Sequence, residues 1–244
     1  MNVFRLIPAA LTGLVLTACA SSPEAREAGD PFEPVNRAVF QFNDAADRAI
    51  VGPAARAYAD VTPRPARRGV RNVFNNLNRP VVFVNTLLQG DPERASDVLI
   101  SFITDTTFGL GGLLSLAEAN GVAQHHEDFG QTLAVWGVED GPYLMLPLIG
   151  PSNLRDGVGR FADRYPHPMN WNEEFSQSGE AWALRTLNGL RIRAEADSAF
   201  ATLDRTAIDP YVQLRSAYRQ MRAEQIRDAQ DDDGTHFDDL PDFD

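Results

Sequence analysis

The sequence predicts an all-α protein with irregular connections rich in glycine and proline. Apolar residues recur at steps of three and four over most of the chain, which is the spacing of one face of an α-helix. No alternating apolar and polar run longer than a few residues is present, and we find no internal repeat. The 244 residues suffice for one good-sized domain, so we expect a single helical body.

The charge of the chain is concentrated at its C-terminus. The formal net charge is -12, but residues 228–244 hold eight aspartates and no basic residue. The rest of the chain therefore carries 26 acidic and 22 basic residues, and every basic residue is arginine. A body so close to neutral does not favour nucleic acid as a partner. The aspartate-rich segment lacks apolar periodicity, so we expect a disordered acidic tail over 228–244.

The N-terminus reads as a lipoprotein signal peptide over residues 1–18. Arg5 precedes an apolar run, Leu6 to Leu16, which is too short to span a bilayer. Leu16-Thr17-Ala18-Cys19 follows and resembles a bacterial lipobox, in which the cysteine is acylated. We therefore predict lipidation at Cys19; the alternative is a signal peptide with an incidental cysteine. Residues 19–29 are small and polar and suit a tether, so the body should begin at residue 30.

The sequence of the first half of the body predicts four helices. An apolar stripe starts after Pro34, and Gly52-Pro53 is expected to end that helix before a short one over Ala54 to Val61. A longer helix should follow Pro65 and extend to Leu88, with Pro80 kinking or dividing it. Asp91-Pro92 is a typical helix start, because the aspartate can cap and proline suits the first position.

The long predicted helix has two unusual polar faces. Neutral amides replace charges on one of them, and this indicates either an ordinary solvated face or a wet but uncharged wall. Arginines share a face at the helix start; they could be merely solvated, or could meet phosphate groups or an acidic partner. The position of these arginines at the helix start argues mildly against phosphate binding through the helix dipole, because the dipole already places positive charge there. The amides are Asn72, Asn75, Asn76, Asn78 and Asn85, and the arginines are Arg64, Arg67, Arg68 and Arg71.

A glycine-rich joint follows the next helix. Gly109, Gly111 and Gly112 separate two apolar segments, and glycine bends without steric cost. We predict a flexible hinge at these three positions. The alternative is a static turn in a buried helical hairpin, which would explain the apolarity equally well.

The segment Gly141 to Asp156 is apolar and interrupted by prolines. Such a segment cannot form an uninterrupted helix or a central strand, so we expect irregular backbone buried against protein or lipid, with Ser152 capping the next helix. Two further helices are expected, one from Ser178 to Asp204 and one starting at Asp209-Pro210.

Motifs of catalysis and metal binding are missing from the sequence. We find no G-x-S-x-G and no H-E-x-x-H. His125 and His126 lie beside Glu127 and Asp128, but adjacent residues do not face one another, so we predict no metal site. No cofactor and no catalytic residue are expected.

Six segments, in unchanged order, resemble the MlaA (VacJ) family. They span about residues 30 to 220. Six such segments in order, following a lipobox, are a specific sign of the family. The segments are DPFEPVNRAVFQFN at 30–43, NRPVVFVNTLLQGDP at 78–92, FGLGGLLSLA at 108–117, EDFGQTLAVWGV at 127–138, GPYLMLPLIGPSNLRD at 141–156 and DPYVQLRSAY at 209–218. We interpret residues 30–227 as an MlaA-like helical domain.

The resemblance implies an outer-membrane lipoprotein that removes mislocalised phospholipid from the outer leaflet. It implies a ring of helices embedded in the inner leaflet, lipid-anchored on the periplasmic side, with an amphipathic channel. Its implied partners are phospholipid, a trimeric porin and a periplasmic phospholipid carrier. Asn43, Asn76 and Asn85 are our candidates for the channel wall. Two other classes stay open: a membrane-anchored periplasmic lipid hydrolase and a purely structural envelope lipoprotein.

Overall fold

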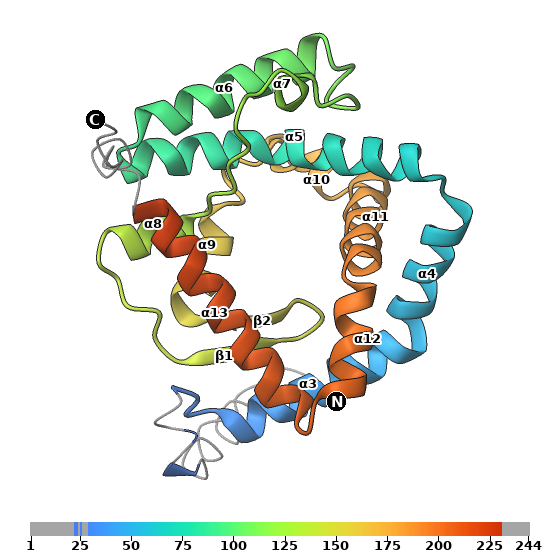
Figure 1. The fold of residues 1–244 in the computed structure, drawn as a ribbon, viewed down its shortest axis with the longest axis vertical. Helices are drawn as coiled ribbons and strands as arrows, with labels where there is room; N and C mark the ends of the chain where they lie inside the picture. The colour runs from blue at the N-terminus through green and yellow to red at the C-terminus, as the bar shows by residue number, and fades with distance from the viewer. Residues whose placement is uncertain (1–21, 24, 26–28, 231–244) are drawn as a thin grey trace, which may run out of the picture.

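The helices are arranged as a ring (Figure 1). The computed structural model describes residues 22, 23, 25 and 29–230. Within these residues the chain is helical apart from one two-stranded antiparallel sheet and the segments that connect the helices and strands. The prediction of an all-α, ring-like domain is thus confirmed. The predicted signal peptide, Cys19 and most of the tether lie outside the described residues.

The first three helical elements follow one another without a break. They are α3 (Glu33–Ala46), the π-helical turn η3 (Asp47–Val51) and α4 (Gly52–Val61). The prediction that Gly52-Pro53 ends the helix is wrong. A π turn is wider than an α turn, and it lies just before Pro53, where the missing N–H would interrupt the regular bonds. The chain therefore changes its helix type instead of stopping.

The longest helix, α5 (Arg64–Gln89), runs beside α6 (Pro92–Thr107) along one edge of the ring (Figure 1). Pro80 does not divide α5, since the buried side chains of Val81 and Val82 anchor the helix just beyond it. Gly90 ends α5 with a φ of 85°, and the Asp91 carboxylate accepts a bond from the Arg94 N–H, as its cap position predicts. The short α7 (Leu116–Ala119) follows the glycine-rich joint.

The proline-rich segment folds as a hairpin and not as irregular backbone. After α8 (Phe129–Val135), strand β1 (Tyr143–Leu146) pairs with β2 (Gly150–Asn153), and Met145 lies opposite Pro151. Both strands of a two-stranded sheet are edge strands, so a proline costs no ladder bond on its free side. Asn153, not Ser152, caps α9 (Leu154–Ala162), because its side chain accepts the bond from the Asp156 N–H at 2.7 Å.

The C-terminal third closes the ring. It comprises η4 (Pro168–Asn170), α10 (Glu173–Ser176), α11 (Gly179–Glu195), α12 (Asp197–Thr206) and α13 (Pro210–Gln230). The single helix expected from Ser178 to Asp204 is two, separated at Ala196. Helix α13 continues beyond residue 227, and the Asp228 carbonyl accepts a bond from Arg94 at 2.7 Å. The start of the predicted tail, 228–230, is thus helical; residues 231–244 lie outside the described part.

Polar groups hold the ring together from inside. Asp30, fully buried, accepts bonds from the Tyr211 hydroxyl, from Arg215 at 2.6 Å and from Asn36 at 2.7 Å. Beside them lies a small apolar cluster that includes Tyr143. Buried charges persist in folded proteins only when they are paired and hydrogen-bonded, as they are here.

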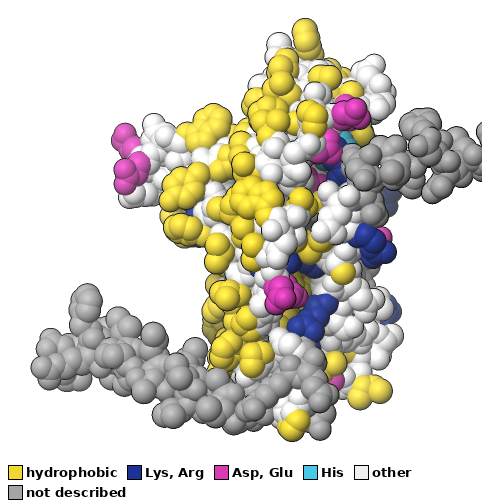
Figure 2. Space-filling view, turned by 90° about the vertical axis from the view of Figure 1, so that its left-hand side faces the viewer, with side chains coloured by type: hydrophobic (Ala, Val, Ile, Leu, Met, Phe, Trp, Pro, Cys, Tyr) yellow, Lys and Arg dark blue, Asp and Glu magenta, His cyan; other side chains and the backbone are white. Residues whose placement is uncertain are grey.

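Large apolar side chains lie on the outside. Figure 2 shows them gathered over one side and one end of the molecule. Tyr165 is 74% exposed and Phe108 is 71% exposed, values far above those of the buried tyrosines. In the described part of the chain, no helix is both long enough and apolar enough to be a membrane span. So many large apolar side chains on the surface are unusual for a water-soluble domain.

Candidate functional site

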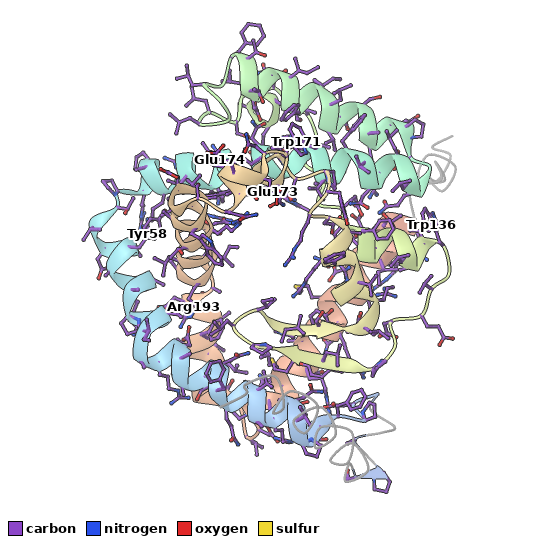
Figure 3. All side chains as sticks on the ribbon, turned by 180° about the vertical axis from the view of Figure 1, so that it is seen from behind. Tyr58, Trp136, Trp171, Glu173, Glu174 and Arg193 are labelled. Atoms are coloured by element: carbon purple, nitrogen blue, oxygen red, sulfur yellow. The ribbon has the colours of Figure 1, made fainter. Side chains whose placement is uncertain are left out.

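A pocket of about 640 Å³ lies between α5, α11 and the segment that joins α9 to α10. Figure 3, which draws the side chains, shows an opening at the centre of the ring; Trp171, at the end of that segment, and Glu173 and Glu174, in α10, lie next to α5 at its edge. Helices α5 and α11 border the same opening (Figure 1). The pocket therefore belongs to the inner wall of the ring.

The lining of this pocket combines cationic, amide and apolar side chains without a carboxylate. The cations are Arg164, Arg185 and Arg191; the amides are Asn75, Asn78, Asn170 and Asn188; the apolar groups are Phe74, Met169, Trp182 and Ile192; His167 completes the wall. Guanidinium groups match phosphate oxygens, amides hydrate polar groups without fixing their charge, and the apolar groups suit hydrocarbon. The arrangement can hold a ligand that has an anionic part and an apolar part.

Hydrogen bonds fix two of the pocket arginines. Arg185 donates to the Ser176 carbonyl at 2.7 Å and to Asn170 Oδ1 at 3.0 Å. Arg191 donates to Asn188 Oδ1 at 2.8 and 3.0 Å and to Glu195 at 3.0 Å. Arg185 has only neutral acceptors among these, so its positive charge remains available to a ligand. A guanidinium held in this way loses little further rotamer freedom on binding.

His167 contributes a polar but uncharged group. Its Nδ1 accepts a bond from the Met169 N–H at 3.2 Å, which closes the N-terminus of η4. Burial, and then the positive charge of Arg185, lower the pKa of the imidazole below its ordinary 6.5. At pH 7 the ring is neutral, so the positive charge of the pocket comes from arginine alone.

The three asparagines predicted for a channel wall are bonded to protein. Asn76 is 4% exposed and donates to Thr106 Oγ1 at 2.9 Å. Asn85 is 1% exposed; it donates to Asp163 at 2.9 Å and accepts from Thr132. Asn43 donates to the Leu146 carbonyl at 2.9 Å and accepts from the Leu148 N–H at 2.7 Å, which fixes the β1–β2 turn. None of them is among the residues that line the pocket, and their contact with lipid stays a prediction.

The glycine-rich joint has the geometry of a tight turn. Gly111 and Gly112 have φ of 70° and 89°, and Leu110 between the glycines has φ of 56°. A Cβ at Gly112 would lie 2.5 Å from the Asn76 Cβ, and one at Gly109 would lie 2.3 Å from the Leu114 carbonyl oxygen. These contacts favour the static-turn alternative at Gly109 and Gly112, while movement of a hinge stays a prediction.

Sequence reasoning missed most of the pocket wall. Asn75 and Asn78 were recognised as amides of one helix, but periodicity alone did not show which amides face the opening. The η4 segment and α11 gave no motif, although the Tyr165-Pro-His-Pro168 break was visible. Among the described residues, no group of three or more His, Cys, Asp or Glu side chains is placed to hold a metal ion; His125 instead lies 3.3 Å from Asp97.

Comparison with known proteins identifies the family of this ring. The family model described as MlaA lipoprotein matches residues 28–225, which include every element from α3 to α12 and most of α13. The chain belongs to the MlaA lipoprotein family. The resemblance read from the six sequence segments is thereby confirmed.

Relatives of this chain match most of its length. The intermembrane phospholipid transport system lipoprotein MlaA of Escherichia coli K12 is 38% identical over 221 residues, covering 88% of this chain and 86% of that protein. The protein of the same description from Haemophilus influenzae is 32% identical, covering 90% and 89%. A solved structure described as "Structural basis for maintenance of bacterial outer membrane lipid asymmetry" superimposes with a TM-score of 0.71 at 35% identity, covering 81% of this chain and 98% of that one.

Proposed function

We propose that this protein removes mislocalised phospholipid from the outer leaflet of the outer membrane and passes it to a periplasmic carrier, which maintains lipid asymmetry. The observation that carries the proposal is the pocket on the inner wall of the ring. Its arginines and amides suit a phosphate headgroup, while Trp182 and Ile192 suit acyl chains. The transport function stated in the names of the relatives supports the same conclusion.

The outer surface supports a position in the membrane. Apolar side chains on the outside would meet acyl chains, and the buried ion pairs would keep the ring closed in that setting. A lipid anchor at Cys19 would hold the protein in the inner leaflet on the periplasmic side. We propose a trimeric porin as the partner that positions the ring, and the carrier as the acceptor of the lipid.

The proposed activity is transport without chemical change of the lipid. Moving a lipid requires a surface that matches both of its parts and needs neither a nucleophile nor a cofactor. A lipid hydrolase would instead release lysophospholipid or free fatty acid. Incubation of the purified protein with labelled phospholipid tests this point: intact lipid supports transport, and cleavage products would contradict it.

Blocking the pocket tests the proposed function directly. Asn75 is exposed within the pocket, and Asn75→Trp would fill part of it; Asn120→Trp on the exposed end of α7 is the matched control. In cells that lack their own copy, the Asn75 variant should let phospholipid accumulate at the cell surface at normal protein abundance, while the control should not. Normal asymmetry with the Asn75 variant would contradict the proposal.

A further inference from the structure

A second pocket, of about 460 Å³, lies between α4, the start of α5 and the end of α11. Five arginines line it: Arg64, Arg67, Arg68, Arg71 and Arg191. Tyr58, Ala194 and Glu195 complete its wall. Four of the arginines are those that share one face at the start of α5, and the fold brings Arg191 to them from α11.

The charge of this pocket is largely uncompensated. Glu195 is the one carboxylate among the lining residues, and its Oε2 accepts from Arg191 at 3.0 Å. Within the described part of the chain, no carboxylate forms an ion pair with Arg64, Arg67, Arg68 or Arg71, the four arginines of α5 that line the pocket. Five guanidinium groups against one carboxylate leave four positive charges around one cavity. Like charges gathered around a cavity repel one another, and a bound anion would relieve that repulsion.

Two buried donors point to the same ligand. The Tyr58 hydroxyl and Arg67 Nε are both buried and have no hydrogen-bond partner among the residues that the structure describes. Both residues line this pocket. A buried donor without an acceptor is unfavourable, so such groups are rare unless a ligand or water satisfies them. The residues of this pocket thus supply unsatisfied donors and positive charge together, which suits an oxyanion.

We propose that this arginine pocket binds a phosphate group. Arginine pairs with phosphate through two parallel N–H donors, which a single surface charge cannot provide. Arg191 lines both pockets, so a phosphate bound here lies beside the proposed lipid pocket. The site deepens the proposed function, on which it rests for the source of the phosphate: it would favour phospholipids with net negative charge. A zwitterionic headgroup also carries an ammonium group, which the arginines repel.

The test compares two arginine pairs of equal charge in the full lipidated protein, purified in a nonionic detergent. Arg64→Gln with Arg68→Gln changes exposed residues that line only the arginine pocket. Arg160→Gln with Arg205→Gln removes the same charge from exposed positions outside both pockets. Calorimetric titration with short-chain phosphatidylglycerol, short-chain phosphatidylcholine and inorganic phosphate measures the affinity of each protein.

The unchanged protein should bind phosphatidylglycerol more tightly than phosphatidylcholine. The pocket variant should lose roughly tenfold or more in phosphatidylglycerol affinity, because it lacks two charge-assisted partners, and the control variant should not. If inorganic phosphate binds and competes with phosphatidylglycerol, the protein recognises the phosphate of the headgroup. Phosphate that binds when phosphatidylglycerol does not, with loss in the pocket variant, supports the site with free phosphate as its ligand.

Equal affinities of the pocket variant and the unchanged protein for all three probes would overturn the proposal, as would absence of binding. The outcome is separate from that of the Asn75 experiment. If Asn75→Trp leaves lipid asymmetry normal while the pocket variant loses phosphatidylglycerol, the transport proposal fails and the phosphate site stands. The reverse pattern rejects the site and keeps the transport proposal.

Discussion

Removing Arg222 should destabilise the ring more than any surface arginine does. Its two terminal nitrogens each donate to Asp128 at 2.6 Å, and one of them also donates to Asp156 at 3.0 Å. The Tyr218 hydroxyl donates to Asp156 as well. Asp128 caps α8 and Asp156 lies in the first turn of α9, so Arg222 fastens α13 to both helices.

The magnitude follows from burial. Arg222 is 7% exposed and Asp156 is 4% exposed, so truncation leaves a buried carboxylate with Arg155 as its remaining ion-pair partner, while the Asp128 side chain is 38% exposed. Breaking a buried pair from one side costs about 3–5 kcal/mol, and the remaining partner and the exposure of Asp128 place the expected loss at the lower end of that range. For a domain of this size, 1 kcal/mol shifts the melting temperature by roughly 2–4 °C, so Arg222→Ala should melt roughly 10 °C lower. Exposed Arg205→Gln should change the stability by less than about 0.5 kcal/mol.

The pH dependence gives a second check on the same residue. Burial by itself raises the pKa of the Asp128 carboxyl, but its bonds to Arg222 outweigh burial and hold the pKa below the ordinary 3.8. A carboxyl with a depressed folded-state pKa stabilises the protein at neutral pH, and this contribution is lost as the pH falls through that pKa. The difference between the Arg222 variant and the unchanged protein should therefore shrink below about pH 4.

Urea unfolding of the purified chain in detergent, followed by circular dichroism, measures both quantities. Unfolding free energies should be compared at neutral pH and on acidification, for the Arg222 variant and the Arg205 control. A loss below 1 kcal/mol for Arg222→Ala, or a loss that does not change with pH, would refute the reasoning. Either result would mean that the ion pairs do not hold the ring closed.

Three further outcomes are expected. Burial raises the pKa of the Asp163 carboxyl to about 6, despite hydrogen bonds that lower it. The native state therefore binds this proton more tightly than the unfolded chain does, and the stability of the protein falls as the pH rises from about 4 to 6. Asp163→Asn should gain stability over the unchanged protein across that range, which melting temperatures measured at each pH will show. Gly112→Ala should lower the melting temperature because of its φ of 89° and the close Asn76 Cβ, whereas Gly189→Ala, in mid-helix with nothing within 4 Å, should stabilise by roughly 0.5–1 kcal/mol. Cys19→Ser should release the protein from the outer membrane or leave it uncleaved, and an unmodified thiol at position 19 in the mass spectrum of the mature protein would contradict the predicted anchor.

Local features of the fold could be predicted from the sequence because their partners lie within a few residues. The Asp91 cap, for example, bonds to a group three residues away. The hairpin at 143–153 was missed because its strands are four residues long and contain a proline, which resembles irregular backbone locally. The break at Ala196 likewise carries no glycine or proline signal.

The ring was expected from the family resemblance and not from periodicity. Helical spacing shows that a face is apolar, but it does not say whether that face meets protein, lipid or an opening. On α5, Asn76 is buried against α6 while its neighbour Asn75 lines the pocket, and one residue of helical rotation separates the two roles.

The sequence by itself determined the helical class, the Asp91 cap and the segments that identify the family. Only the tertiary structure decided which polar groups are internal ties and which face the opening. Arg222 and Asp128 are 94 residues apart in the sequence, and Arg191, on the distant helix α11, lines one pocket together with arginines of α5. Such pairings depend on how the helices close into a ring, and the free energy of that closure is a sum over distant contacts that no local pattern contains.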